Sequence, residues 1–323
     1  MKEPLKVYEA FAGKGTFSEA FTDLNILHEI VGYCKIDPYA STAFTAIHNI
    51  SEDLNGWDIT KVNPNTLPDF DVFTHGSPCT SFSMAGKRDG ADKNSGTQSS
   101  LIWYSVEIIK NKKPKYVLWE NVSDVLSNKH IHNFEEYINE LANIGYNSYF
   151  KVLIATDFGI PQKRKRIYVV SIRNDIDKGD FYFPLNNNDI KLSLKDVLEK
   201  DVDNKYYVSE RCLNGIKNSE FVQKANQIQD IEKPCATILA RDYKDPKIVI
   251  DKKGYRKLSP LEYFRLMDES DENFYKIKEA LIHKFYNGKD RADSQLYKIA
   301  GNSIVKRVLV EYYKILFKDY MKQ

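Results

Sequence analysis

A cysteine follows a short apolar run in the first half of the chain. Residues 71–75 (Asp-Val-Phe-Thr-His) are typical of a buried strand, and Gly76-Ser77-Pro78-Cys79 comes directly after them. Pro78 fixes its own φ and restricts Ser77 to extended conformations, so the Cys79 thiol leaves the strand end at a defined angle. A free cysteine is more often a buried apolar side chain. Its position at a strand end nevertheless favours a nucleophile, because open α/β sheets carry their chemistry there.

A carboxyl and two guanidinium groups could act beside this thiol. Glu120 follows the apolar run 116–119, so we expect it at a strand's carboxyl end, where apolar neighbours would favour its protonated form. Arg164 and Arg166 alternate with lysines into the apolar run 167–170, which predicts both guanidinium groups on one strand face. Such groups hold a carbonyl oxygen or a phosphate bidentately. The alternatives are a surface glutamate and a solvated basic face.

Alternating strand and helix signals predict the elements that would position these groups. Strands are expected over residues 5–11, 30–36, 72–74 and 116–119, and helices after the first glycine turn, after Pro38, and over 101–109 and 134–144. Two further β-rich runs, 149–154 and 166–172, are candidates to close the same sheet. The order is typical of an α/β fold with a doubly wound, mostly parallel sheet.

The regular pattern stops near Arg173 and returns near Lys257. Ser259-Pro260-Leu261-Glu262 has the residues of a capping box and predicts a helix start. The spacing of Ile304, Val308, Tyr312 and Ile315 predicts a closing helix. We therefore expect a catalytic and cofactor-binding domain over 1–173, a smaller domain over 174–255 and a C-terminal segment, 256–323, that returns to the first domain.

Composition excludes several classes of protein. The four cysteines (Cys34, Cys79, Cys212 and Cys235) lie far apart without a CxxC pair, which argues against a zinc site and a disulfide framework. The six histidines form no metal-binding pattern, so no catalytic metal is expected. No apolar run is long enough to span a bilayer and no signal peptide is evident, so we expect a cytoplasmic protein without membrane partners. A net charge of +2 over 323 residues does not by itself indicate a polyanionic partner.

A glycine turn follows the first expected strand. Residues 11–15 (Phe-Ala-Gly-Lys-Gly) would let the backbone approach a cofactor closely, although Ser18 replaces the third glycine of a dinucleotide fingerprint. Lys35 occupies the end of the second strand, where an acid for the ribose is expected. Asp58 is expected at the next strand end, where it could accept a hydrogen bond from an adenine amino group while Ile59 packs on the ring. The alternative for Asp58 is a helix cap.

Five segments occur together in one order: Phe11-x-Gly13-x-Gly15, Gly76-Ser77-Pro78-Cys79, Glu120-Asn121-Val122, Gln162-x-Arg164-x-Arg166 and Gly301-Asn302-Ser303. In this combination the chain resembles the cytosine-C5 DNA methyltransferase family over about residues 5–173 and 256–320. The middle section is then the expected target-recognition domain, and Cys235-Ala236-Thr237-Ile238 is similar to the Thr-Leu segment of such domains. Three positions depart from the family pattern: Lys35, Thr80 where Gln is common, and Ile238 where Leu is common.

The resemblance implies a DNA (cytosine-5-)-methyltransferase that uses S-adenosylmethionine and acts on duplex DNA as a monomer, either in a restriction-modification system or as an orphan or phage methylase. Cys79 would attack C6 of a flipped cytosine, Glu120 would bind N3 and the exocyclic amine, and Arg166 would hold O2, with Arg164 or Arg166 favouring the thiolate. The implied cofactor-binding residues are Phe11, Gly13, Gly15, Ile36, Asp58, Ile59, Pro78, Leu101, Asn302 and Ser303. The implied DNA-binding residues are Ser83, Lys87, Arg88, Gln162 and Thr237, three of them in a glycine-containing loop over 80–100 that we expect to close on the substrate.

Three other functions are weighed against this one. A nicotinamide oxidoreductase would share the sheet and the glycine turn, but it would leave Cys79, Glu120 and Arg166 without a role. An RNA cytosine methyltransferase would share the catalytic residues and lack an extended DNA-reading domain, so the middle section of about eighty residues favours DNA. A catalytically silent DNA-binding relative would not need the complete set of reactive groups.

Overall fold

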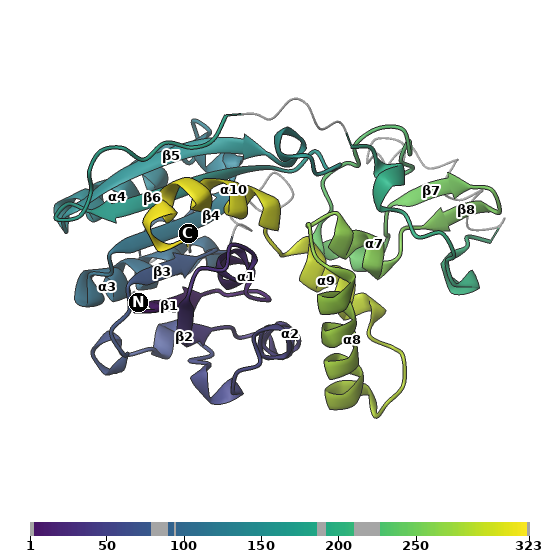
Figure 1. Ribbon diagram of the computed structural model, residues 1–323, viewed down its shortest axis with the longest axis horizontal. Helices are drawn as coiled ribbons and strands as arrows, with labels where there is room; N and C mark the ends of the chain where they lie inside the picture. The colour runs from purple at the N-terminus through teal and green to yellow at the C-terminus, as the bar shows by residue number, and fades with distance from the viewer. Residues whose placement is uncertain (1–2, 79–89, 94, 186–191, 210–226, 322–323) are drawn as a thin grey trace. The chain divides into compact units, whose positions relative to one another are not determined.

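The computed structural model describes residues 3–78, 90–93, 95–185, 192–209 and 227–321. They form two compact units, shown in Figure 1. The first unit contains Met1–Leu153, Lys165–Leu185 and Val308–Gln323, and the second contains Ile154–Arg164 and Asn186–Arg307. Within the described ranges, every helix is too short or too polar to cross a bilayer.

A six-stranded sheet with the order β2-β1-β3-β4-β6-β5 organises the first unit. Its strands are β1 (Leu5–Ala10), β2 (His28–Cys34), β3 (Val72–His75), β4 (Tyr116–Val122), β5 (Tyr146–Ile154) and β6 (Lys165–Arg173). β1 pairs in parallel with β2 and β3, and β3 with β4, whereas β6 runs antiparallel to β4. The predicted mostly parallel α/β sheet is confirmed, and the two later β-rich runs do join it.

Helices cover both faces of this sheet. They are α1 (Thr16–Asp23), α2 (Pro38–His48), α3 (Ile102–Lys112), α4 (Ile131–Asn143) and α10 (Lys306–Leu316). Apolar side chains of α3 and α4 share one core with Tyr8, Phe73 and Trp119 of the sheet. On the other face, the ring centres of Phe21 in α1 and Tyr313 in α10 lie 4.6 Å apart. Figure 1 shows α10 over the sheet. The closing helix predicted from its apolar spacing is therefore confirmed.

Local capping explains where several helices begin. The Asp37 carboxylate accepts hydrogen bonds from the backbone of Tyr39 and Ala40, and Pro38 occupies the first turn of α2.

Gly15 precedes α1 with a φ of 91°, and a Cβ there would lie 2.1 Å from Nε2 of His48. Only glycine fits this position, because it combines a left-handed backbone with a close side-chain approach.

In the part of the second unit that the structure describes, the longer elements are a short hairpin and three helices: β7 (Ile248–Asp251), β8 (Gly254–Lys257), α7 (Pro260–Arg265), α8 (Asp271–Tyr286) and α9 (Asp293–Gly301). α7 starts at the predicted capping box. The carboxylate of Glu262 also binds the buried Arg256 guanidinium through two bonds of 2.8 Å. The compact units divide the chain differently from the predicted domains, because residues 256–307 belong to the second unit and only 308 onward to the first.

Candidate active site

The carboxyl ends of four strands meet at one edge of the sheet. Ala10 of β1 pairs with Cys34 of β2 and with His75 of β3, and His75 pairs with Trp119 of β4. The residues that follow these positions therefore leave the sheet side by side. In the order β2-β1-β3 the connections turn to opposite sides of β1, which is the switch point where α/β sheets bind ligands.

The glycine turn after β1 leaves open space at this edge. Phe11 and Gly13 both have left-handed backbones, with φ of 53° and 60°. Apart from the chain neighbours of Gly13, no atom of the described residues lies within 4 Å of the position that a Cβ on Gly13 would occupy. A bound group can therefore approach the backbone here, as the sequence predicts.

The segment after β2 is held by Asn55. Its side chain accepts a hydrogen bond from the Lys35 backbone N–H at 2.9 Å, donates to the Lys35 carbonyl at 3.0 Å, and accepts from the Trp57 N–H at 2.8 Å. Burial lowers the pKa of Lys35, and this effect outweighs the nearby Asp37 carboxylate, which raises it. The next side chain, Ile36, is 68% exposed.

Asp58 caps a short helix and does not follow a strand. Its Oδ1 accepts hydrogen bonds from the Thr60 N–H at 3.0 Å and the Thr60 hydroxyl at 2.8 Å, at the start of η2 (Ile59–Lys61). These bonds lower the pKa of Asp58. The expected strand end is therefore wrong, and the capping alternative describes its local role. The Ile59 side chain is buried.

Hydrogen bonds hold Ser77 and Pro78 in place where the chain leaves β3. The Ser77 hydroxyl accepts hydrogen bonds from Nε1 of Trp119 at 3.0 Å and Nδ2 of Asn121 at 3.2 Å, and the Ser77 carbonyl accepts from the same Nδ2 at 3.1 Å. The Ser99 hydroxyl donates to the Pro78 carbonyl at 2.9 Å. The sequence did not predict a role for Trp119, Asn121 or Ser99 as hydrogen-bond donors here, although Asn121 belongs to the Glu120-Asn121-Val122 segment.

The other residues predicted near this strand end are Leu101 and a group that begins at Cys79. Leu101 ends η4 (Gln98–Leu101), directly before α3. Cys79, Thr80, Ser83, Lys87 and Arg88 lie outside the described residues.

Glu120 and Arg166 form an ion pair across two strands. Register pairs Glu120 with Tyr168 and Val122 with Arg166, so Arg166 lies diagonal to Glu120 on the same face. Nε of Arg166 lies 3.2 Å from Oε1 of Glu120, and these side chains are only 13% and 10% exposed. Trp119 points to the other face and packs on Tyr137, so it is not the apolar neighbour that was expected to favour a protonated Glu120.

Arg164 does not share the environment of Arg166. β6 begins at Lys165, so the predicted strand alternation does not reach Arg164, which belongs to the second unit. Its guanidinium donates to the carbonyl oxygens of Ile238 at 3.1 Å, Gly301 at 3.4 Å and Ser303 at 2.8 Å. This buried side chain holds backbone segments together, which does not fit the predicted contact with substrate.

Gln162 and Thr237 also make contacts inside the second unit. The Gln162 amide donates to the Leu266 carbonyl at 2.8 Å and accepts from the Ile238 N–H at 3.1 Å, with no exposed surface left. This burial does not fit the predicted DNA contact. The Thr237 hydroxyl donates to the Lys163 carbonyl at 2.8 Å, and the Thr237 side chain stays half-buried.

The Gly301-Asn302-Ser303 motif lies at the end of α9, and Gly301 packs closely against the backbone of another segment of the second unit. A Cβ on Gly301 would lie 2.3 Å from the backbone of both Leu239 and Ala240, so glycine is required for this approach. Asn302 is exposed and Ser303 is buried. Both predicted cofactor ligands belong to the second unit, whereas the other predicted cofactor residues belong to the first.

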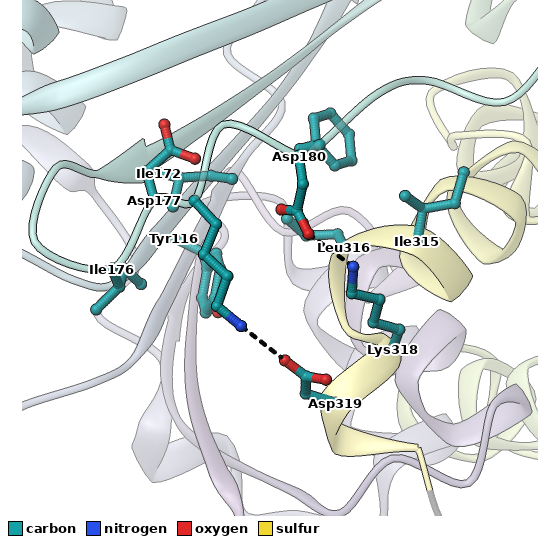
Figure 2. Close-up of a pocket in the computed structure, with 11 residues that line it drawn as sticks. Tyr116, Ile172, Ile176, Asp177, Asp180, Ile315, Leu316, Lys318 and Asp319 are labelled. Atoms are coloured by element: carbon teal, nitrogen blue, oxygen red, sulfur yellow. Dashed lines mark hydrogen bonds and ion pairs between the residues drawn. The ribbon is translucent and has the colours of Figure 1, made fainter.

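A pocket of the first unit lies at the opposite edge of the sheet. Figure 2 shows it at Tyr116, where β4 begins, beside Leu316 of α10. Two ion pairs border it, Lys178 with Asp319 and Lys318 with Asp180. None of the predicted site residues lines this pocket.

Comparison with known proteins identifies the family. Residues 5–318 match the C-5 cytosine-specific DNA methylase family. The type II methyltransferase M2.ScrFI of Lactococcus lactis subsp. cremoris is 33% identical over 98% of this chain and 99% of its own. The type II methyltransferase M.HhaI of Haemophilus parahaemolyticus is 32% identical over 94% and 92%. The crystal structure of the S. pombe Dnmt2 methyltransferase has the same fold, with a TM-score of 0.74 at 20% identity, covering 98% of this chain and 99% of that one. The chain therefore belongs to the C-5 cytosine-specific DNA methylase family and is a DNA (cytosine-5-)-methyltransferase.

Proposed function

We propose that this enzyme methylates C5 of a flipped cytosine in duplex DNA with S-adenosylmethionine, through a covalent adduct on Cys79. The observation that carries the proposal is the Glu120–Arg166 pair, with Nε of Arg166 3.2 Å from Oε1 of Glu120, where Glu120 belongs to β4, the strand next to the one that leads to Cys79. A carboxylate and a guanidinium on one face match the polar edge of cytosine, which offers donors and acceptors side by side.

The sheet edge supports S-adenosylmethionine as the cofactor. Open space at Gly13 and the N-terminus of α1 suit its carboxylate end, because helix N-termini bind anions. The exposed Ile36 and the Asp58 carboxylate suit the adenine ring and a polar group on the nucleoside. When bound, S-adenosylmethionine supplies an electrophilic methyl group. Phe11, Gly15, Ile59, Pro78 and Leu101 complete the proposed set in the first unit, and Asn302 and Ser303 remain proposed from the family motif.

The chain's own residues activate the base. The Cys79 thiolate adds to C6, which makes C5 electron-rich, and Arg166 holds the O2 oxygen as negative charge develops on the ring. Glu120 binds N3 and the exocyclic amine. After transfer, C5 loses its proton and the Cys79–C6 bond breaks, which restores the aromatic base and the free thiolate.

We assign target recognition to the second unit. Two features support this role: Gln162, Lys163 and Arg164 hold Thr237 and Ile238 by hydrogen bonds, and Nζ of Lys244 and of Lys298 lie 5.7 and 4.5 Å from the centre of the Tyr243 ring. Paired cations next to a polar surface suit DNA phosphates. M2.ScrFI and M.HhaI are bacterial type II enzymes, and other relatives come from phages, so we place this enzyme in the cytoplasm of a bacterial or phage-infected cell, acting as a monomer.

A methyl-transfer assay tests the proposal. The protein is incubated with labelled S-adenosylmethionine and duplex DNA, tRNA or no nucleic acid. We expect label in duplex DNA only, and bisulfite sequencing of that DNA should show methylated cytosine at one recurring sequence. Label in tRNA alone, or in neither acid, would overturn the assignment.

Lys35 gives a prediction about the cofactor. Both backbone groups of Lys35 are fixed by Asn55, so a substituted side chain keeps its starting point at the end of β2. We expect Lys35→Glu to tighten S-adenosylmethionine binding about tenfold, because a carboxylate accepts hydrogen bonds from ribose hydroxyls and a lysine cannot. Calorimetry measures the change, and Lys110→Glu on the exposed side of α3 is the charge-matched control. Equal or weaker binding by Lys35→Glu would contradict this placement.

A further inference from the structure

Ser77 is the most constrained residue on the path from β3 to Cys79. Its side chain is buried, and its hydroxyl accepts hydrogen bonds from Trp119 and Asn121 of the adjacent strand. A serine hydroxyl has two acceptor lone pairs and one proton. Both lone pairs are therefore used by β4, and the hydroxyl has little freedom to rotate.

Two neighbouring rings pack against Trp119 and contact each other. The His75 ring stacks on Trp119 with a distance of 6.0 Å between ring centres and an interplanar angle of 14°. The centre of the Tyr137 ring lies 4.7 Å from that of Trp119. Nε2 of His75 and the Tyr137 hydroxyl are hydrogen-bonded at 2.9 Å. Burial lowers the pKa of His75 to about 3, so its ring stays neutral at physiological pH. The indole N–H thus points at Ser77 from a rigid support that carries no charge.

The residues on either side of Ser77 do not provide this control. Gly76 has no side chain, and apart from its chain neighbours no described atom lies within 4 Å of where its Cβ would be. Pro78 has no N–H, and among the described residues its carbonyl accepts a hydrogen bond from the Ser99 hydroxyl. The direction in which the backbone leaves β3 therefore depends on the bonds that Ser77 receives.

We propose that Ser77 and Trp119 form a positioning pair, in which the indole N–H fixes the Ser77 hydroxyl and so sets the approach of Cys79 to the base. The proposal rests on the proposed function, because it takes Cys79 as the nucleophile. A displacement of about 1 Å can cost a hundredfold in rate when a reacting group is held in place. Loss of one hydrogen bond here should therefore slow the addition step much more than it weakens substrate binding.

The test measures adduct formation directly. Ser77→Ala and Trp119→Phe each remove the bond but keep the backbone or the ring, and Ser77→Thr keeps the hydroxyl. Each variant is mixed in excess with duplex DNA containing 5-fluorocytosine in the presence of S-adenosylmethionine, and the single-turnover rate of the covalent complex is recorded. This rate constant does not depend on the fraction of protein that is active, so partial misfolding does not change it.

We expect about a ten- to hundredfold lower rate constant for Ser77→Ala and for Trp119→Phe, with the KM for DNA and for S-adenosylmethionine within about twofold of wild type. The double variant should be no slower than the slower single one, because both changes remove the same bond. Ser77→Thr should recover most of the rate. Ser105→Ala is the matched control, since the described residues offer its buried hydroxyl no hydrogen-bond partner.

Two results would overturn the positioning pair. The first is a wild-type rate constant in Ser77→Ala, and the second is multiplication of the two single effects in the double variant. Failure of the proposed function looks different, because the wild-type protein would then form no covalent complex at all.

Discussion

Replacing Cys79 with alanine is expected to abolish methyl transfer while S-adenosylmethionine binding stays within about twofold of wild type. Cytosine C5 is a poor nucleophile, and without addition at C6 the ring has no route to the electron-rich intermediate, so covalent catalysis is lost completely. The proposed cofactor contacts come from other side chains and from backbone, so binding survives. A filter assay for methyl transfer and calorimetry for binding measure the two properties on the same preparation.

Cys34 offers a matched control for this experiment. It is a buried thiol of the first unit, hydrogen-bonded to the Tyr8 hydroxyl at 3.1 Å, and burial raises its pKa to about 11. Such a thiol is not ionised at physiological pH and cannot act as a nucleophile. Cys34→Ala should therefore keep full turnover per folded molecule. Measurable turnover by Cys79→Ala would refute the covalent mechanism, whereas loss in both variants would point to a general effect of thiol removal.

Sequence patterns predicted the elements of the first unit because the signals are local. The apolar runs that became β1, β3 and β4 are four to seven residues long, and the caps of α2 and α7 are built from neighbouring residues. The local signal at Asp58 was a cap, and its bonds to Thr60 are those of a cap. The expected strand end was wrong because no strand ends directly before Asp58.

The candidate site could be predicted only in part, because its geometry depends on pairing between distant segments. Arg164 and Arg166 share a period-two spacing, yet only Arg166 lies inside β6, and its contact with Glu120 depends on the antiparallel register of β4 and β6. Nothing in the spacing shows that Arg164 instead binds carbonyls at 238, 301 and 303. The hydrogen bond from Trp119 to Ser77 spans 42 positions, and no local pattern predicts it.

Glu120→Gln is the second substitution with a large expected effect, and it separates the chemical role of the carboxylate from its shape. Glutamine keeps the size of the side chain and one acceptor oxygen, so an oxygen can remain near Nε of Arg166, which lies 3.2 Å from Oε1 of Glu120. It carries no negative charge and cannot exchange a proton with the base. We expect kcat to fall by about 10²–10⁴, the range found for loss of a general acid or base, with little change in S-adenosylmethionine binding.

Arg166→Lys tests whether the two side chains act as a unit. Lysine keeps the charge but loses the planar fork, so it should hold both O2 and Glu120 less well, and we expect a smaller but clear loss in kcat. Because Glu120 and Arg166 are 3.2 Å apart and largely buried, the double variant should lose less than the product of the single losses. Full multiplication would show that the two groups work independently. A Glu120→Gln enzyme within tenfold of wild type would remove the carboxylate from the mechanism, since the cytosine would then be activated by Cys79 and Arg166 alone.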